Sequence, residues 1–295
     1  MEMVEIKNMQ HCTVEEKVQA WNTGFEGYYF DMTTTPDAFE KRGEAEGLSD
    51  KLSVVAFEDG TPVGLVRNGV REWQGKKVAW NGGTGVAPSV RGKGIGKKLM
   101  EAALDILQSE GVHAATLEAV KENKQAIEFY KRMGYSIVDE VHFMQLKGKV
   151  KNIQFSSAGD KISLSAATPE DAGQLSFYRG DFTWQTQWES VKDGEAVFAA
   201  DKTGKAIGYA YFRKTMDHEG KHASTVLYQC EVAPDSEGRK AIAEQLILAV
   251  FDQFSGNINR IAVNVPVEGN KLTHEALEEF GFIITAAQVF MKKEL

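Results

Sequence analysis

The sequence has little cysteine and contains no long hydrophobic run. Its two cysteines, Cys12 and Cys230, stand far apart and without the close spacing of metal ligands. This pattern favours two reduced thiols in a reducing compartment over a disulfide or a metal site. No apolar run approaches about 18 residues, the length of a membrane-spanning helix, and the N-terminal residues (MEMVEIKNMQ) are too charged for a signal peptide. We therefore expect a cytoplasmic protein with no membrane partner.

The sequence also lacks an excess of positive charge. It carries 34 Lys and Arg against 42 Asp and Glu, which gives a formal net charge of −8. Because nucleic-acid binding needs a basic face, this balance argues against a nucleic-acid partner, and it permits a cationic substrate without demanding one. The length of 295 residues suits one large domain or two domains of about 150 residues.

Three landmarks occur twice, in the same order, in the two halves of the chain. AFEDGTPVGLV at residues 56–66 resembles AADKTGKAIGYA at 199–210, VAP at 86–88 recurs 146 residues later, and NKQAIEFYKRMGY at 123–135 matches NKLTHEALEEFGF 147 residues later. Such a nearly constant offset indicates an internal repeat. We predict two tandem domains, residues 1–148 and 155–295, which meet at the polar stretch 148–156. Since no Pro- or Ser-rich linker separates them, we expect them to pack closely as a pseudo-dimer.

Strands alternate with helices in the first copy, which predicts an α/β (α+β) fold. Thr35 and Pro36 have the character of a helix cap followed by proline at the first helical position. We expect helices at 14–28, 36–46, 94–109 and 123–133, and strands at 4–7, 53–58, 62–73, 77–87, 114–120 and 135–146.

A glycine-rich segment, Arg91-Gly92-Lys93-Gly94-Ile95-Gly96, lies between an apolar strand and the amphipathic helix 94–109. Glycines let backbone N–H groups approach an anion, and a helix start carries unpaired N–H donors with partial positive charge. A dinucleotide fingerprint would need glycine where Lys97 stands, and a P-loop would need Ser or Thr where Lys98 stands. Both of those phosphate-binding motifs are therefore excluded.

The spacing V-x-P-x-x-R-G-x-G-I-G-x-x-L at residues 86–99 resembles the GCN5-related N-acetyltransferase (GNAT) family. The resemblance implies that each copy has a mixed, mostly antiparallel twisted sheet flanked by helices. It also implies that this segment holds the pyrophosphate of acetyl-coenzyme A (acetyl-CoA), while the preceding strand pairs with the pantetheine arm. The implied cofactor-binding residues are Thr84, Gly85, Val86, Arg91, Gly92, Lys93, Gly94, Ile95 and Gly96.

A second motif, Asn123-x-x-Ala126-x-x-x-Tyr130, follows the strand at 114–120. In the family this asparagine bonds the cofactor arm, and the tyrosine hydroxyl lies near the sulfur. The resemblance therefore assigns Asn123 and Tyr130 to the cofactor, makes Tyr130 the acid that assists the departing thiolate, and makes the N–H of Val86 the oxyanion donor. For Tyr130, a packed aromatic side chain remains the alternative.

The general base is less closely defined. Glu118 lies five residues before Asn123, where some members of the family carry their proton acceptor. It is equally suited to be a surface carboxylate of the strand, and a water chain can serve in its place. The strand before Val86 reads WNGGTG at 80–85 and offers no carboxylate.

The acceptor pocket has no motif of its own. In the family, the first two helices and their loop shape this pocket, and here that region is rich in aromatic residues. Its candidate substrate contacts are Trp21, Phe25, Tyr28 and Tyr29. An aromatic cluster can hold a cationic amine, although core packing explains the same residues.

The second copy has lost most of the signature. At an offset of 146, the segment 91–96 corresponds to Glu237-Gly238-Arg239-Lys240-Ala241-Ile242, and at 147 Tyr130 and Glu118 correspond to Leu277 and Val265. We therefore predict that the second copy is degenerate, does not catalyse and does not bind acetyl-CoA tightly.

The sequence thus predicts an N-acetyltransferase in which a primary amine attacks acetyl-CoA directly, without a metal. The amine belongs to a small molecule or a peptide. The alternative is a non-catalytic acyl-CoA-binding sensor or scaffold. A monomeric pseudo-dimer and a homodimer are both open.

Overall fold

The computed structural model describes residues 4–148 and 162–295, which divide into two compact units. The first unit contains the described residues up to Ala119, together with Asn123–Ile137 and Met291–Leu295. The second contains Val120–Glu122 and the described residues of Val138–Phe290. Nearly all of the expected boundary at 148–156 lies outside the described residues, so the domain limits remain a prediction.

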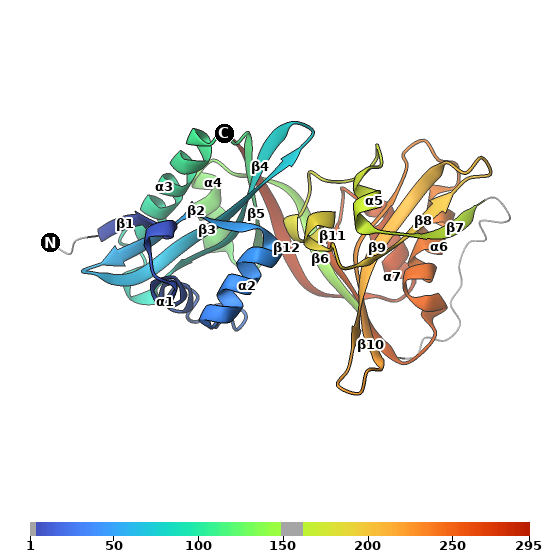
Figure 1. Cartoon of the computed structure of the whole chain (residues 1–295), viewed down its shortest axis with the longest axis horizontal. Helices are drawn as coiled ribbons and strands as arrows, with labels where there is room; N and C mark the ends of the chain where they lie inside the picture. Colours follow the sequence, from blue (N-terminus) through green and yellow to red (C-terminus); the bar gives the residue numbers. More distant parts are fainter. Residues whose placement is uncertain (1–3, 149–161) are drawn as a thin grey trace. The chain divides into compact units, whose positions relative to one another are not determined.

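The first unit is built on a sheet in the order β1-β2-β3-β4-β5 (Figure 1). These strands are β1 (Val4–Asn8), β2 (Leu48–Glu58), β3 (Thr61–Trp73), β4 (Lys76–Val86) and β5 (Ala114–Val120). Neighbouring strands are antiparallel, except that β4 and β5 are parallel. The last residue of the chain, Leu295, donates its backbone N–H to the carbonyl of His113, just before β5.

Helices cover both faces of this sheet: α1 (Val14–Gly24), α2 (Pro36–Glu46), α3 (Ile95–Ser109) and α4 (Lys124–Arg132). Leu65 of β3 belongs to a buried cluster with Trp21 of α1 and Phe39 of α2. A Cβ added to the preceding residue of β3, Gly64, would meet the side chain of Leu99 of α3 at 3.3 Å. Because successive strand residues face opposite sides, α1 and α2 lie on one face and α3 on the other.

Local sequence explains where these helices begin and end. Thr13 and Glu16 form a reciprocal capping box at α1, and Thr35 caps α2 with proline following, as expected. Helix α2 ends at Gly47, whose φ of 66° suits glycine. Helix α1 ends at Gly24, four residues earlier than expected, because Phe25 leaves the helical conformation and Gly27 turns the chain with a φ of 70°.

The second unit contains a mixed sheet in the order β12-β6-β11-β10-β9-β8-β7. The strands are β6 (Ser136–Gly148), β7 (Ser163–Ala167), β8 (Glu195–Ala200), β9 (Ala206–Met216), β10 (His222–Val232), β11 (Ile258–Pro266) and β12 (Ile283–Glu294). Again one central pair, β10 and β11, is parallel. The helices are α5 (Pro169–Gly173), α6 (Arg239–Val250) and α7 (Lys271–Glu279). Short 3-10 turns at Trp184–Thr186 and Trp188–Ser190 occupy the region that corresponds to α2.

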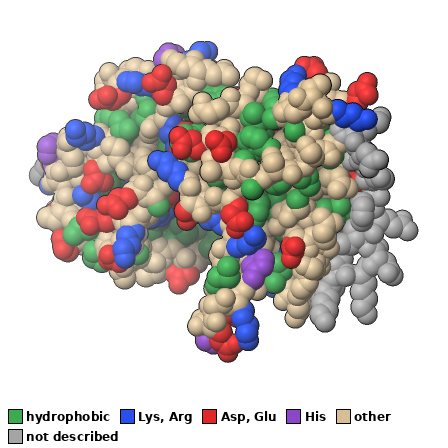
Figure 2. Space-filling view, turned by 45° about the vertical axis from the view of Figure 1, so that its right-hand side comes forward, with side chains coloured by type: hydrophobic (Ala, Val, Ile, Leu, Met, Phe, Trp, Pro, Cys, Tyr) green, Lys and Arg blue, Asp and Glu red, His purple; other side chains and the backbone are tan. Residues whose placement is uncertain are grey.

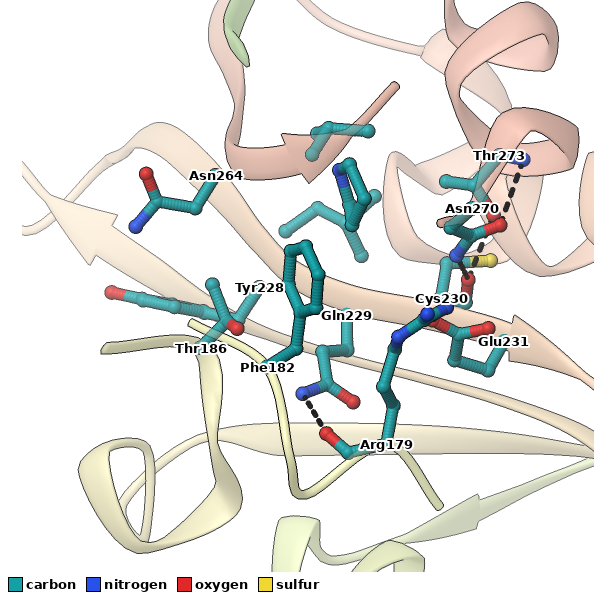
Figure 3. A pocket seen from close by; sticks show the side chains of 13 residues that line it. Arg179, Phe182, Thr186, Tyr228, Gln229, Cys230, Glu231, Asn264, Asn270 and Thr273 are labelled. Atoms are coloured by element: carbon teal, nitrogen blue, oxygen red, sulfur yellow. Dashed lines mark hydrogen bonds and ion pairs between the residues drawn. The ribbon is translucent and has the colours of Figure 1, made fainter. Parts of the chain in front are cut away.

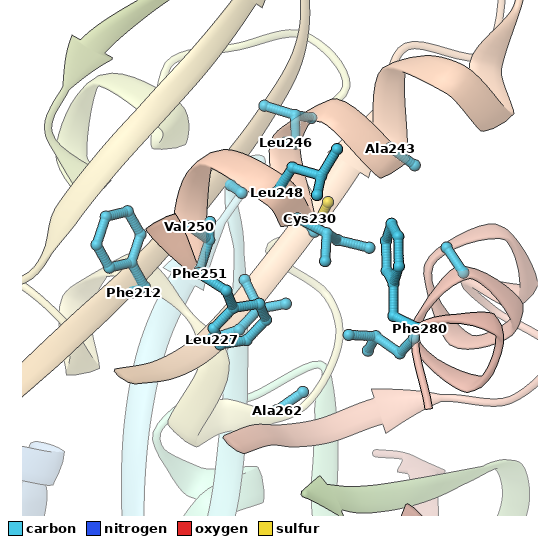
Figure 4. Close-up of a cluster of buried hydrophobic side chains, with 14 of the residues drawn as sticks. Phe212, Leu227, Cys230, Ala243, Leu246, Leu248, Val250, Phe251, Ala262 and Phe280 are labelled. Carbon is cyan, nitrogen blue, oxygen red and sulfur yellow. The ribbon is translucent and has the colours of Figure 1, made fainter. Parts of the chain in front are cut away.

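The core of the second unit forms where α6 and α7 pack on the sheet. Leu246 and Leu248 of α6 join Cys230 of β10, Ala262 of β11 and Phe280, which follows α7 (Figure 4). The predicted fold class, a mixed and mostly antiparallel sheet flanked by helices, is confirmed.

Three observations concern the predictions made from charge, cysteine content and hydrophobicity. On the face seen in Figure 2, basic and acidic side chains are intermixed rather than gathered into one basic area. Cys12 and Cys230 are both free and buried. No helix among residues 4–148 and 162–295 is long and apolar enough to cross a membrane.

Candidate active site

Strands β4 and β5 separate halfway along their length. Their parallel pairing runs from Val78 opposite Ala114 to Trp80 opposite Thr116 and then stops, although both strands continue. The pairing of β4 with β3 shifts register at the same level, between residues 81 and 83. Such a bulge increases local twist and bends a strand away from its neighbour. Beyond residue 80, one edge of β4 is therefore left without a paired strand in the described residues.

The direction of the backbone groups on this edge follows from one hydrogen bond. Ala87 donates its N–H to the carbonyl of Val63 in β3, at 2.8 Å. Because N–H groups alternate between the two edges of a strand, Gly85 also faces β3, whereas Thr84 and Val86 direct N–H and C=O toward the open edge. The N–H and C=O of Thr84 and the N–H of Val86 thus lie on this edge, while the Val86 carbonyl accepts a hydrogen bond from Arg91.

The glycine-rich segment leads from this edge into α3. Gly92 and Gly94 have φ values of 81° and 83°, a conformation that strains any residue with a Cβ. Gly94 is the N-cap of α3, and no side chain caps the helix there. The first N–H groups of α3 are therefore free of a side-chain acceptor, which is the arrangement that binds an anion. The helix begins at Ile95, one residue later than expected.

The cations of this segment are partly engaged by the protein. Arg91 donates from Nε to the carbonyl of Val86 at 2.9 Å, and its Nη2 lies 3.4 Å from the carbonyl of Glu26. Lys93 forms an ion pair with Glu58 at 3.1 Å, and Lys97 lies 3.6 Å from Glu101. The Arg91 side chain therefore fastens the segment to β4 and to the end of α1. The sequence pattern gave no sign of this positioning role.

Four side chains meet where β4, α1 and α4 approach one another. The hydroxyl of Tyr130 lies beside that of Thr84, and Tyr28 lies beside Asn123. Asn123 also caps α4 by accepting from the N–H of Ala126 at 3.1 Å. Burial raises the pKa of Tyr130 to about 12, with a smaller upward contribution from Tyr28. Tyr130 is therefore a neutral hydrogen-bond donor at every pH near neutrality.

Glu118 lies on β5, two residues beyond the last paired position. Its Oε2 accepts a hydrogen bond from the indole Nε1 of Trp80 at 2.7 Å, and the side chain is half-buried. The carboxylate is thus held beside the point where the two strands separate. The contribution of Trp80 was missed, because a tryptophan in a strand gives no sequence signal of a polar role.

The aromatic side chains near α1 divide into two groups. Trp21 and Phe25 are 2% and 9% exposed and pack in the buried cluster of this face, and the Trp21 Nε1 donates to the carbonyl of Met32 at 2.7 Å. This favours core packing for both. Tyr28 is half-buried and Tyr29 is 52% exposed, so these two remain accessible to an acceptor.

The second unit repeats the strand separation. Pairing of β10 with β11 ends at Leu227 opposite Ala262, although β10 continues to Val232. Here, however, α7 is tied to the open edge: Asn270 and Thr273 each donate to the carbonyl of Cys230 at 2.7 Å. Leu277, which stands in place of Tyr130, is fully buried in the core cluster.

The residue correspondence expected within the glycine-rich segment is wrong. Both helices begin after a glycine with positive φ, Gly94 for α3 and Gly238 for α6. The path from Val86 to Gly94 is eight residues, whereas the path from Val232 to Gly238 is six. The second segment is thus two residues shorter, and Lys240 matches Gly96 rather than Gly94. Two of the three glycines are still missing from it.

No group of His, Cys, Asp and Glu within the described parts of the chain is arranged to hold a metal ion.

Comparisons with known proteins concern the family of this part of the chain and the fold of the whole chain. Residues 14–135 match the model of the acetyltransferase (GNAT) family. An uncharacterised N-acetyltransferase of Methanocaldococcus jannaschii is 38% identical over 118 residues, which is 38% of this chain and 50% of that protein. Streptothricin acetyltransferase of Streptomyces lavendulae is 32% identical over 97 residues, 33% of this chain and 50% of that protein. The chain thus spans half the length of these curated relatives.

Two solved structures share the fold of the whole chain. A tandem GNAT protein from the clavulanic acid biosynthesis pathway has a TM-score of 0.61 at 15% identity, covering 99% of this chain and 98% of that one. The GCN5-related glucosamine N-acetyltransferase region of a fungal β-N-acetylglucosaminidase has a TM-score of 0.68 at 16% identity, covering 99% of this chain and 38% of that one. At such identities the likeness concerns the fold alone. Taken with the family match, it identifies residues 14–135 as a domain of the acetyltransferase (GNAT) family within a chain that has a tandem GNAT fold.

Proposed function

We propose that the first unit transfers an acetyl group from acetyl-CoA to a primary amine by direct attack. One observation carries this proposal: the open edge of β4 leads directly into an uncapped helix start with two glycines at positive φ. An edge of free backbone groups suits the amides of an extended arm, and the helix start suits a pyrophosphate.

The residues of this site fit acetyl-CoA in both parts. The N–H and C=O of Thr84 and the N–H of Val86 would hold the pantetheine arm, and the N–H groups of Gly92–Gly96 would hold the pyrophosphate; the Val86 carbonyl is already bound by Arg91. A Cβ on Gly96 would lie 3.6 Å from the Val86 side chain, so this position is not crowded by the protein. When bound, acetyl-CoA supplies the activated acetyl thioester.

The protein must manage one proton and two developing charges. An alkyl ammonium has a pKa of about 10.4, so the acceptor needs a base at neutral pH. We assign this role to Glu118, directly or through a water chain; the support is the Trp80 hydrogen bond, which holds its carboxylate where β4 and β5 part. The outward N–H of Val86 would stabilise negative charge on the carbonyl oxygen.

The pKa of Tyr130 limits what this phenol can do. A thiol leaves as a thiolate with a pKa of about 8.5, by analogy with cysteine. Full proton transfer from a phenol with a pKa of about 12 to that thiolate is uphill by roughly 3.5 pKa units, or about 5 kcal/mol. We therefore assign Tyr130 to donating a hydrogen bond to the thiolate, with solvent supplying the proton later.

We further propose that the second unit does not bind acetyl-CoA tightly. The ties of Asn270 and Thr273 to β10 occupy a carbonyl on the edge that corresponds to the open edge of β4. Glu237 also lies immediately before the helix-capping Gly238, where a carboxylate would oppose a pyrophosphate. The cytoplasmic location and the choice between monomer and homodimer stay predictions.

The test is free-thiol release from acetyl-CoA across a panel of amines, which should include streptothricin-like antibiotics because one relative bears that name. At least one amine should give turnover that Tyr130→Phe slows while acetyl-CoA binding persists. Micromolar binding of acetyl-CoA without turnover on polyamines, amino acids, peptides or antibiotics would instead favour the sensor or scaffold.

A further inference from the structure

A buried amide, that of Asn81, lies at the bulge of β4. Gly82 is the extra residue of this bulge, because Asn81 and Gly83 pair with consecutive residues of β3. Residues three apart in a regular strand point to opposite faces, and one extra residue brings Asn81 and Thr84 onto the same face. Asn81 Nδ2 lies 3.6 Å and Thr84 Oγ1 3.7 Å from the Met100 sulfur on α3. The bulge thus places an amide and a hydroxyl together on the α3 face of the sheet.

The Asn81 amide is bound at both ends, and one contact fixes its orientation. Its Oδ1 accepts from the backbone N–H of Gly83 at 3.0 Å, and a backbone N–H can only donate. The Nδ2 of Asn81 therefore faces Thr84, and it donates to the hydroxyl Oγ1 at 2.7 Å. The Thr84 oxygen thus accepts from Asn81, and the Thr84 hydrogen is left for another acceptor.

Two acceptors lie beside the Thr84 hydroxyl, the Met100 sulfur and the phenol oxygen of Tyr130. A thioether sulfur is a weak acceptor, so the phenol oxygen is the better partner. Burial raises the pKa of Tyr130 to about 12, and Thr84 acts in the opposite direction, as a group that donates to the phenol oxygen does. A phenol that accepts from Thr84 directs its own hydrogen away from Thr84.

The second unit has the same bulge without these polar side chains. One extra residue, Tyr228, interrupts the pairing of β10 with β9 (Figure 3). At the offset of 146, Leu227 and Cys230 stand in place of Asn81 and Thr84. A bulge that forms with leucine at this position does not need the amide for its shape.

The three polar side chains are replaced together. Leu277, which stands in place of Tyr130, belongs to the same buried apolar cluster as Leu227 and Cys230. The first unit therefore has a linked set of amide, hydroxyl and phenol, and the second unit has an apolar core at the same positions. The role of Asn81 thus goes beyond the bulge and is tied to Tyr130.

We propose that Asn81 is a positioning residue that acts on the acetyl transfer through Thr84. The inference rests on the proposed function of the first unit, in which Tyr130 donates a hydrogen bond to the departing thiolate. By donating to Thr84, Asn81 commits the Thr84 hydrogen to the phenol oxygen and leaves the phenol hydrogen for the sulfur. Without this donation, the Thr84 oxygen can accept from Tyr130 instead, and the thiolate loses its donor.

The first test is Asn81→Asp, which keeps an acceptor for the Gly83 N–H and replaces the donor that faces Thr84 by an acceptor. The value of kcat should fall by about tenfold, the worth of one hydrogen bond, with little change in the dissociation constant of acetyl-CoA. Thr84→Val removes the hydroxyl and keeps the shape of the side chain, so it should lower kcat by a similar factor. Because both changes interrupt one chain of hydrogen bonds, the double variant should be no slower than the slower single variant.

The second test needs no acceptor amine. A hydrogen bond to a thiolate lowers the pKa of the thiol, so coenzyme A bound to the wild type should ionise at a lower pH than free coenzyme A. The ultraviolet absorbance of the thiolate measures this pKa. Asn81→Leu, which introduces the residue of the second unit and adds no charge, should raise the pKa of the bound thiol by roughly 0.5 to 1.

Three results would overturn the inference. They are a kcat of Asn81→Asp within about threefold of the wild type, additive losses in the double variant, and a bound thiol whose pKa Asn81→Leu leaves unchanged. If the wild type acetylates no amine, the proposed transfer fails, and the pKa of the bound thiol alone decides on the role of Asn81. If coenzyme A does not bind to the wild type, both proposals fail.

Discussion

The most informative perturbation of the cofactor site is a carboxylate at Gly94. This glycine caps α3 with φ 83° and ψ 2°, and a Cβ added there would meet no protein atom within 4 Å. Gly94→Ala therefore adds only left-handed backbone strain, about 1–2 kcal/mol. Since that strain is present with and without ligand, Gly94→Ala should change the dissociation constant for acetyl-CoA less than tenfold.

Gly94→Glu adds a negative charge to the same strain. At a separation of about 6 Å and an effective dielectric constant near 20, one unit of repulsion with the pyrophosphate is worth roughly 3 kcal/mol. The dissociation constant should therefore rise at least 100-fold, as measured by calorimetry at low salt. Raising the ionic strength should recover part of the loss.

The second unit supplies a matched control. Gly238 caps α6 with φ 66°, and a Cβ there would also meet nothing within 4 Å. Gly238→Glu should cost similar stability, seen as a similar fall in Tm, and leave acetyl-CoA binding intact. If Gly94→Ala weakens binding as much as Gly94→Glu, or if Gly238→Glu weakens it too, the charge-based reasoning is refuted.

Three further predictions concern titratable side chains. Tyr130→Phe should lower kcat roughly 10- to 100-fold, the value of a charge-assisted hydrogen bond, with little change in acetyl-CoA affinity; an unchanged kcat would make this tyrosine a packing residue. Glu118→Gln should lower kcat at pH 7 by about 100-fold or more. The difference in kcat from the wild type should become smaller as the pH is raised toward the pKa of the amine. A change in kcat below threefold at every pH would assign the base to water. Burial and His142, whose Nδ1 lies 2.8 Å from Nε2 of His274, lower the pKa of His274, so its folded form favours the neutral ring. As the pH falls below about 6.5, the unfolded chain therefore binds a proton before the folded chain does, and the free energy of unfolding should decline. His274→Asn should make this decline smaller, as measured by urea titrations at pH 5 and 7. An unaltered dependence of the free energy of unfolding on pH would contradict this.

The sequence predicted the fold class because the signals were local and repeated. Thr35 and Pro36 predicted the start of α2, and the periodicity of the hydrophobic residues predicted the order of strands and helices. The end of α1 was placed too late, because aromatic residues continue past Gly24 and conceal the turn at Gly27. The β4–β5 separation depends on a non-local bulge, and nothing near Gly82 in the sequence specifies its effect on pairing.

The candidate site was predictable at the positions where the backbone conformation allows only glycine. Gly92 and Gly94 stand out because positive φ requires them. Side-chain partnerships were not predictable, since the proximity of Thr84 to Tyr130 and the hydrogen bond of Trp80 with Glu118 join residues far apart in the chain.

The central claim is that one chain carries one acetyl-CoA site, in the first unit. Calorimetric titration of the full chain with acetyl-CoA tests it most directly. The account predicts a single equivalent bound per chain, with Gly94→Glu abolishing the heat of that one event. Two equivalents, or one equivalent that survives Gly94→Glu, would contradict it.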